Sequence, residues 1–357
     1  MKTAIIGLPQ AGKTSLFTIL TGVHETTRVG SHEARIGVAR VPDPRLDTLA
    51  RVFQTPKTTH ATVEYLDFPA ISKEALRDPS YLASMRLADA LAHVLRMFHD
   101  ETVPHEFGSI DPVRDMNEVD AELILSDLMV IEKRLERLEK DRKKIKSAEL
   151  DQEYELLVRA KALLEENQPL RNLRLDEQEE KRIRGFQFLS QKPMLYVLNL
   201  DESDAPRLHE IEGEFREGPL RGHTQTAVTA VCGKIEAELA ELVPEEAGDY
   251  LASYGLQEPG LERLIAATYS LLGLMSFLTV GDNEARAWTV PVHTHALHAA
   301  GAIHTDFEKK FIRAEVINWK DLVECGGYAA AREKGRLRLE GKEYEVREGD
   351  VLLIRHG

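Results

Sequence analysis

The 357-residue sequence has little cysteine, few aromatic residues and an excess of negative charge. Its two cysteines, Cys232 and Cys325, are too few for a disulfide framework and lack the spacing of a metal site, which favours a reducing compartment. No apolar run is long enough to span a bilayer, and the first residues lack the pattern of a secretion signal. We therefore expect a cytoplasmic protein. The formal net charge of −14 excludes a protein that coats nucleic acid with its whole surface.

The clearest motif lies near the start of the sequence. A short apolar run, residues 3–6, precedes Gly7-Leu8-Pro9-Gln10-Ala11-Gly12-Lys13-Thr14-Ser15, and a helical pattern follows. The spacing Gly-x-x-x-x-Gly-Lys-Thr predicts a phosphate-binding loop, in which backbone N–H groups surround a phosphate and the lysine contacts the β- and γ-phosphates. The helix directs its positive end at the same anion. We expect residues 7–15 to bind a nucleoside triphosphate; an ordinary glycine-rich turn is the alternative.

Residues 61–67 alternate between apolar and polar and end in Asp67. In enzymes with a phosphate-binding loop, an aspartate at the end of a buried strand holds Mg²⁺ together with the loop hydroxyl. We therefore expect Thr14 and Asp67 to face one magnesium ion. A turn residue at the end of a strand is the alternative explanation of Asp67.

Two more apolar runs, residues 192–199 and 225–231, also predict buried strands. The first leads into Asn199-Leu200-Asp201-Glu202 and the second into Cys232-Gly233. Because α/β proteins bind ligands at the carboxyl ends of their strands, we expect both segments to join the phosphate-binding loop in one nucleotide site.

The middle of the chain has a different pattern. Leu128, Ile131, Leu135, Leu138 and Ile145 recur at heptad-like spacing with charged residues between them. A second helical run ends before Pro169. The sequence thus predicts an antiparallel helical hairpin inserted into the nucleotide-binding domain. A partner-binding arm and a structural hairpin with solvated charges explain this pattern equally well.

The last part of the chain predicts a small mixed α+β domain. Short strands are expected at 286–290, 313–317, 344–346 and 351–355, around a helix near 305–311. Arg332, Lys334, Arg336 and Arg338 could form a basic edge for RNA, although a solvated face is an equally good explanation.

With these motifs the chain resembles the YchF family, the Obg-like ATPases of the translation-factor class. The resemblance covers nearly the whole length and is most specific at residues 286–289, 299–309, 311–315 and 341–351. It implies an α/β fold with three parts: a Ras-like P-loop NTPase domain at 1–113 and 186–275, a coiled-coil hairpin at 114–185, and a β-grasp (TGS) domain at 276–357. It also implies binding of ATP and Mg²⁺, slow ATP hydrolysis, and association with the ribosome or RNA in a translation or stress role.

The segment from Asn199 to Glu202 bears on base specificity. GTPases of this class read guanine with the aspartate of Asn-Lys-x-Asp, whereas this chain has Leu200 and Glu202 at the second and last positions. A buried carboxylate aimed at adenine N1 would place two hydrogen-bond acceptors against each other, which is unfavourable. Glu202 must therefore point elsewhere. The resemblance implies that ATP is preferred over GTP and that Asn199 contacts the purine.

Hydrolysis requires an oriented water molecule. Ras-like enzymes use a glutamine just after Asp-x-x-Gly, but the matching residue here is Ile71, which cannot orient water. The resemblance implies His105, on the loop after the next strand, as the catalytic group beside Lys13. The pKa range of histidine suits proton handling. A histidine on a surface loop is the alternative.

Four departures from the family pattern bear on activity. Ala70 replaces the glycine of Asp-x-x-Gly, and no glycine occurs from Phe68 to Phe107. Ser31 stands about where the family has its switch-I threonine, and we expect it to bind Mg²⁺ with Thr14 and Asp67. Gln10 replaces an asparagine that supports K⁺ binding in related enzymes. The sequence therefore leaves two functions open: a slow ATPase, which the intact phosphate residues favour, and an ATP-binding scaffold with little hydrolysis. A GTPase is disfavoured by Glu202.

Overall fold

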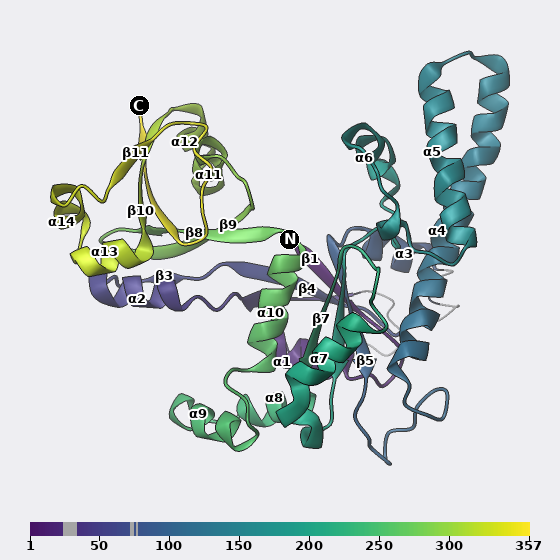
Figure 1. Ribbon diagram of the computed structural model, residues 1–357, viewed down its shortest axis with the longest axis horizontal. Coiled ribbons are helices and arrows are strands. Elements are labelled where there is room, and N and C mark those ends of the chain that lie inside the picture. Colours follow the sequence, from purple (N-terminus) through teal and green to yellow (C-terminus); the bar gives the residue numbers. More distant parts are fainter. Residues whose placement is uncertain (24–33, 72–74, 76–77) are drawn as a thin grey trace. The chain divides into compact units, whose positions relative to one another are not determined.

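The computed structural model describes residues 1–23, 34–71, 75 and 78–357 (Figure 1). The chain forms two compact units. The first unit contains Met1–Val38 and Glu64–Leu271, and the second contains Ala39–Val63 and Leu272–Gly357. Residues 39–63 thus group with the C-terminal part of the chain, whereas the predicted division gives them to the nucleotide-binding domain. None of the described helices is long and apolar enough to cross a membrane.

The first unit is built on a six-stranded sheet with the order β2-β4-β1-β5-β6-β7. Its strands are β1 (Lys2–Ile6), β2 (Arg35–Arg40), β4 (Thr62–Asp67), β5 (Ala90–Arg96), β6 (Met194–Asn199) and β7 (Thr226–Val231). From β4 to β7, all neighbouring strands are parallel. Every residue of β5 and β6 is buried, as expected for central strands covered on both faces. The buried strands predicted from the sequence are confirmed.

The other helices of this unit, apart from two long ones described below, are short. They are α1 (Lys13–Thr21), α3 (Pro79–Arg86), α6 (Glu177–Ile183), α7 (Leu208–Glu217), α8 (Gly233–Leu239), α9 (Pro244–Ser253) and α10 (Gly260–Leu271), with short 3₁₀ turns η2 (Leu170–Asn172), η3 (Arg184–Phe186) and η4 (Glu202–Arg207). Both α7 and α10 pack on β7. A buried hydrogen bond of 3.1 Å from the Tyr65 hydroxyl to Thr268 Oγ1 joins α10 to β4.

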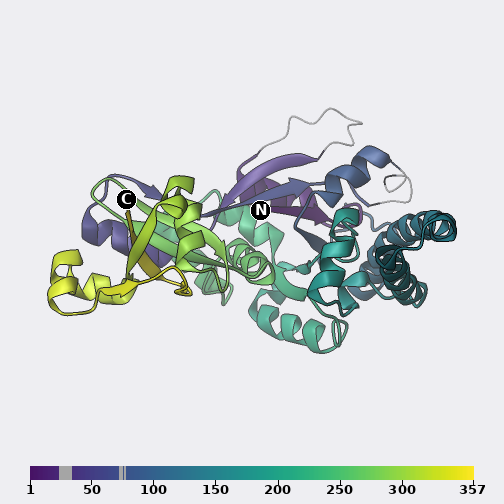
Figure 2. The same cartoon turned by 90° about the horizontal axis from the view of Figure 1, so that it is seen from above.

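Two long helices, α4 (Pro112–Lys144) and α5 (Ala148–Glu165), form an arm and lie side by side in Figures 1 and 2. The Asp111 side chain caps α4 by accepting hydrogen bonds from two backbone N–H groups of its first turn. The arm encloses its own apolar cluster, whose buried members include Ile131, Leu135, Leu138, Leu156, Leu157 and Ala160. The predicted hairpin is confirmed. Including Ile145 in its seam was wrong, because that residue follows the end of α4 and is 62% exposed.

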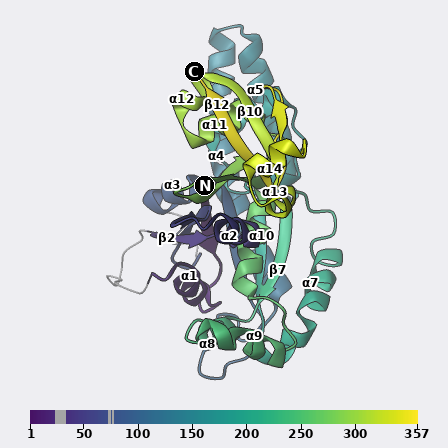
Figure 3. The same ribbon diagram turned by 90° about the vertical axis from the view of Figure 1, so that its left-hand side faces the viewer.

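The second unit has its own six-stranded sheet, with the order β11-β10-β12-β8-β9-β3. Its strands are β3 (Thr58–Thr59), β8 (Leu274–Val280), β9 (Ala285–Pro291), β10 (Phe311–Asn318), β11 (Arg338–Glu340) and β12 (Asp350–His356), and its helices are α2 (Pro44–Phe53), α11 (Ala296–Ile303), α12 (Thr305–Lys309), α13 (Trp319–Cys325) and α14 (Tyr328–Glu333). Figure 3 shows α11 and α12 beside β10 and β12. The mixed α+β arrangement is confirmed, but residues 344–346 form only a single bridge, from Glu345 to His295.

Helix α2 explains why residues 39–63 belong to the second unit. It packs against β8, β9 and α13, and its Leu46 and Leu49 side chains are fully buried. The Arg45 guanidinium pairs with Glu348 at 2.5 Å, and the rings of Phe53 and Tyr328 lie 5.7 Å apart. An amphipathic pattern in α2 is visible in the sequence, but the sheet that covers its apolar face is more than two hundred residues away.

Candidate nucleotide-binding site

The predicted phosphate-binding loop joins the end of β1 to the start of α1, as the motif requires. Gly7 and Gly12 have φ angles of 145° and 92°. A β-carbon on Gly7 would clash with the Val94 carbonyl oxygen, and one on Gly12 would clash with the Asn199 amide nitrogen. Gln10 also has a positive φ of 61°, which is unusual for a residue with a side chain. The loop therefore needs these two glycines for both its backbone angles and its close contacts.

Lys13 is buried inside this loop. Its Nζ donates a hydrogen bond of 2.6 Å to the Leu8 carbonyl oxygen. Burial lowers the pKa of Lys13 to about 8, although the carboxylates of Asp67 and Glu106 act in the opposite direction. The amine thus contacts the backbone of the loop itself.

Thr14 and Asp67 lie together, as predicted. The Thr14 hydroxyl donates to Asp67 Oδ2 at 3.1 Å, and the Arg35 guanidinium donates to the same oxygen. Asp67 is 4% exposed, and its Oδ1 has no hydrogen-bond partner within the described ranges. A hydroxyl and a carboxylate suit Mg²⁺, which prefers oxygen ligands and takes the rest from phosphates and water. Ser31, the third predicted ligand, lies outside the residues that the structure describes.

The predicted base-binding segments converge on a cavity of about 480 Å³ next to this loop. Its lining consists of Gly12, Ser15, Phe98, His99, Asp100, Asn199, Leu200, Asp201, Glu202, Gly233, Lys234 and Ala237. The loop, the segment after β6 and the segment after β7 thus meet at one edge of the sheet. Cys232 precedes α8 and is buried, and burial raises the pKa of its thiol.

Asn199 connects two of these segments. Its Nδ2 donates to the Ala11 carbonyl oxygen at 3.1 Å, and its Oδ1 accepts from the Gly233 N–H at 3.0 Å. Leu200, the residue in the lysine position of GTPases, is 2% exposed and packs in the core. The Asn199 side chain therefore links the phosphate-binding loop to the β7–α8 turn.

Glu202 points toward Lys234, with which it forms an ion pair at the rim of the cavity. The carboxylate is 28% exposed, so the pair is partly screened by solvent. Glu202 was expected to point away from the base, and Lys234 is the group that engages it.

His105 lies at the foot of the arm. Its Nε2 lies 2.9 Å from Asp115 Oδ2, and the Phe107 N–H donates to Nδ1 at 3.1 Å. Since Nδ1 accepts a hydrogen bond, Nε2 carries the proton that is donated to Asp115. The neighbouring Glu106 interacts electrostatically with Lys13.

Comparison with known proteins adds a family to this geometry. The chain is 38% identical over 370 residues to "Ribosome-binding ATPase YchF" of Bacillus subtilis (strain 168), with 99% of each covered. The protein of the same name from Haemophilus ducreyi (strain 35000HP / ATCC 700724) is 39% identical over 369 residues, with 99% of this chain and 98% of that protein covered. The chain belongs to the YchF family.

Two further matches agree with this assignment. Residues 274–357 match the family model YchF-GTPase_C, described as "Protein of unknown function (DUF933)". The solved structure of the Schizosaccharomyces pombe YchF GTPase superposes with a TM-score of 0.83 at 28% identity, covering 99% of this chain and 97% of that one. The Ras-like P-loop fold is therefore the fold of a YchF protein. The bacterial relatives are named ATPases and the yeast protein a GTPase, so base preference depends on the site itself.

The sequence did not point to several residues of this YchF site. Phe98 and His99 follow β5 at the carboxyl edge, and the rule that found Asn199 could also have found them. Arg96 lies with its guanidinium 4.6 Å from the Phe98 ring and donates to the Val103 carbonyl oxygen at 2.8 Å, which shapes the loop after β5. Arg35 had no local signal, because only folding places it beside Asp67.

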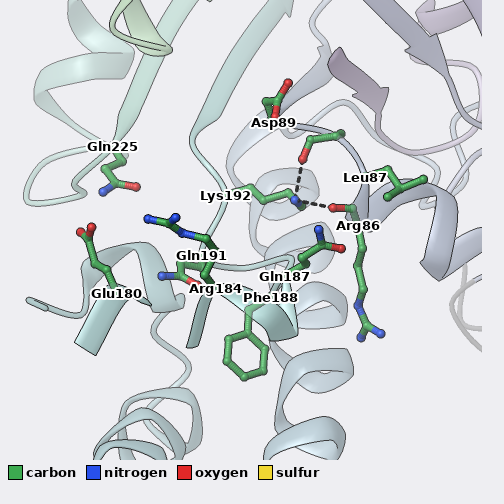
Figure 4. Close-up of a pocket in the computed structure, with 11 residues that line it drawn as sticks. Arg86, Leu87, Asp89, Glu180, Arg184, Gln187, Phe188, Gln191, Lys192 and Gln225 are labelled. Carbon is green, nitrogen blue, oxygen red and sulfur yellow. Dashed lines mark hydrogen bonds between the residues drawn. The ribbon is translucent and has the colours of Figure 1, made fainter. Parts of the chain in front are cut away.

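A second cavity of about 320 Å³ lies at the amino ends of β5 and β6, the sheet edge opposite the candidate nucleotide site (Figure 4). Its Lys192 side chain donates to the carbonyl oxygens of Arg86 at 2.8 Å and Ala88 at 2.5 Å. The lysine thus holds the carboxyl end of α3, and burial lowers its pKa. This arrangement stabilises the helix end.

Proposed function

We propose that this YchF protein binds ATP in preference to GTP, hydrolyses it slowly with Mg²⁺, and works in contact with the ribosome. The ion pair between Glu202 and Lys234 is the observation that carries the base preference. Guanine recognition needs a carboxylate free to accept from N1–H and the exocyclic amine. Here that carboxylate is engaged by an ammonium group, while Phe98 offers the purine an aromatic surface in the same cavity.

The base preference can be tested by competition titration with a fluorescent nucleotide. ATP should bind more tightly than GTP to the unmodified protein. Lys234→Ala should narrow that difference, because Glu202 is then free to accept from guanine. Lys342→Ala, an exposed lysine of the second unit, is the matched control. Equal affinities for ATP and GTP in the unmodified protein would refute the proposed preference.

For hydrolysis, Lys13, Thr14 and Asp67 would hold the phosphates and Mg²⁺, which neutralises the charge that develops during phosphoryl transfer. His105 would orient the water after exchanging its contact with Asp115 for one with the water. Turnover should be slow because Ile71, at the position where Ras-like enzymes carry the water-orienting glutamine, is buried and has no polar side chain.

Single-turnover ATP hydrolysis with excess protein tests the catalytic part of the proposal. We expect measurable turnover that falls at least about a hundredfold in His105→Ala, the size of a typical general acid–base contribution. His209→Ala, an exposed histidine on α7, is the control and should retain the original rate.

The second candidate function is a scaffold that binds ATP but hydrolyses little of it. Both ring nitrogens of His105 are engaged by protein groups, which favours this alternative. Tight ATP binding with no turnover in either the unmodified protein or the variant would support the scaffold over the ATPase.

We propose that the tip of the arm, rather than the basic edge of the second unit, contacts ribosomal RNA. In that edge Arg332 pairs with Glu315 and Arg336 with Asp321 and Glu324, so much of its charge is neutralised. The arm tip instead carries a run of exposed lysines that have no ion pair among the described residues: Lys140, Lys143, Lys144 and Lys146. Such a cluster on an acidic molecule suits a phosphate backbone.

A further inference from the structure

Arg35 occupies an unusual place in the phosphate end of the site. It is the first residue of β2, and its guanidinium donates to Asp67 Oδ2, the oxygen that also accepts from the Thr14 hydroxyl at 3.1 Å. The side chain is 18% exposed and its guanidinium lies 5.3 Å from the centre of the Phe17 ring. A cation is thus held beside the two groups that would bind Mg²⁺.

The charges of the described residues around Asp67 indicate a role for this cation. Asp67 has a buried carboxylate, and two cations, Lys13 and Arg35, act on it. A guanidinium on Oδ2 withdraws charge from the oxygen ligands that a metal would use, and it repels a second cation at contact distance. The same guanidinium shares the Asp67 Oδ2 acceptor with the hydroxyl of Thr14, a residue of the phosphate-binding loop, and Arg is well suited to phosphate oxygens.

We propose that Arg35 is a resident counter-cation of the phosphate site. It neutralises Asp67, supplies positive charge to a bound triphosphate, and weakens the binding of Mg²⁺ at Thr14 and Asp67. The inference rests on the proposed function, because it concerns the ATP site. Its consequence is that nucleotide binding by this chain depends little on Mg²⁺, in contrast to a site where the metal is the main cation beside the aspartate.

The test compares ATP dissociation constants measured by calorimetry with excess Mg²⁺ and with EDTA. In the unmodified protein the two constants should agree within about threefold, because Arg35 supplies the missing charge. Arg35→Ala and Arg35→Gln should each increase the ratio of the ATP dissociation constant in EDTA to that in Mg²⁺ by at least about tenfold. Without the guanidinium, ATP is attracted less strongly when the metal is absent, and Mg²⁺ binds better when it is present.

Two control variants separate charge from structure. Arg35→Lys keeps the charge and should keep the ratio near that of the unmodified protein. Arg40→Ala removes an exposed arginine at the far end of the same strand and should leave it unchanged. Thermal unfolding shows whether each variant is folded. If Arg35→Ala does not fold, Arg35→Gln, whose side chain is closer in shape to arginine, is the neutral variant that tests the inference.

Two results would overturn the inference, and they differ. If ATP binds but the ratio in both neutral variants stays within about twofold of the unmodified protein, Arg35 is a structural ion pair and the proposed function stands. If no variant and no unmodified protein binds ATP under either condition, the proposed function fails together with the inference.

Discussion

Lys13 has a chemical property at the residue scale that solution measurements can detect. Its amine is buried against the Leu8 carbonyl oxygen, and burial lowers its pKa to about 8. Free protein above this pH therefore contains mostly neutral Lys13. A bound triphosphate stabilises the charged amine and raises its pKa, so ATP binding at alkaline pH must include the uptake of a proton.

We therefore expect the dissociation constant for ATP to be nearly constant below about pH 7 and to increase by up to about tenfold per pH unit above pH 8. Calorimetry in buffers of different ionisation enthalpy would detect the proton taken up. Lys13→Arg, which stays protonated throughout, is the control and should show no uptake. A constant affinity and no proton uptake between pH 7 and 9 would contradict this assignment of Lys13.

At the scale of elements, Asp127 anchors the arm to the sheet. It is a fully buried residue of α4, and its two carboxylate oxygens accept from the Leu189 N–H at 3.0 Å and the Ser190 N–H at 2.7 Å, just before β6. Burial raises its pKa to about 6. Because this pKa lies above that of an unfolded aspartate, the contribution of Asp127 to the free energy of unfolding falls as the pH rises through 6.

Asp127→Asn should lower the free energy of unfolding by about 1–3 kcal/mol at pH 7, because an amide replaces one acceptor with a donor that faces a buried N–H. Urea denaturation measures the effect. Glu136→Gln, on the exposed face of the same helix, should change stability by less than about 0.5 kcal/mol. Equal stability of the two variants would show that the anchor contributes nothing.

The arm tip gives a second prediction at this scale. Reversing two charges with Lys143→Glu and Lys144→Glu should weaken co-sedimentation with ribosomes and reduce its dependence on salt, because fewer phosphate contacts release fewer counterions. Lys334→Glu and Lys342→Glu, in the second unit, form the matched control pair. If only the control pair weakened binding, the contact would belong to the second unit.

At the scale of the whole molecule, the chain does not divide where its C-terminal family match begins. The match starts at residue 274, but α2, with its fully buried Leu46 and Leu49, belongs to the same compact unit. The second unit is therefore assembled from two separate pieces of the chain, and neither piece encloses that apolar face alone.

Truncation after Leu271 should consequently produce a protein that exposes the apolar face of α2. We expect it to bind a hydrophobic dye, to aggregate, and to unfold at a lower temperature than the full chain. Replacing Leu46 and Leu49 by polar residues in the truncated protein should reduce the dye signal. A truncated protein that stays monomeric and binds no dye would show that residues 39–63 fold without the C-terminal part.

Much of the fold and part of the site follow from local patterns in the sequence. The phosphate-binding loop, the strands that end at Asp67 and Asn199, and each helix of the hairpin have a local signature in the sequence, because strand, loop and helix preferences act over short distances. The rule that parallel strands present their carboxyl ends at one edge then brings Asn199 and Gly233 to the loop, as the structure does.

Only the tertiary structure decided which charges meet. Arg35 and Asp67, and Glu202 and Lys234, are each about thirty residues apart, and ion pairs between distant residues leave no periodic mark in a sequence. The joining of residues 39–63 to the second unit is likewise a long-range choice, since an amphipathic helix shows that it needs a cover but not which sheet provides it. The sequence by itself determined the helices, the strands and the phosphate-binding loop. Packing between distant segments determined which charged side chains pair in the site that these elements form.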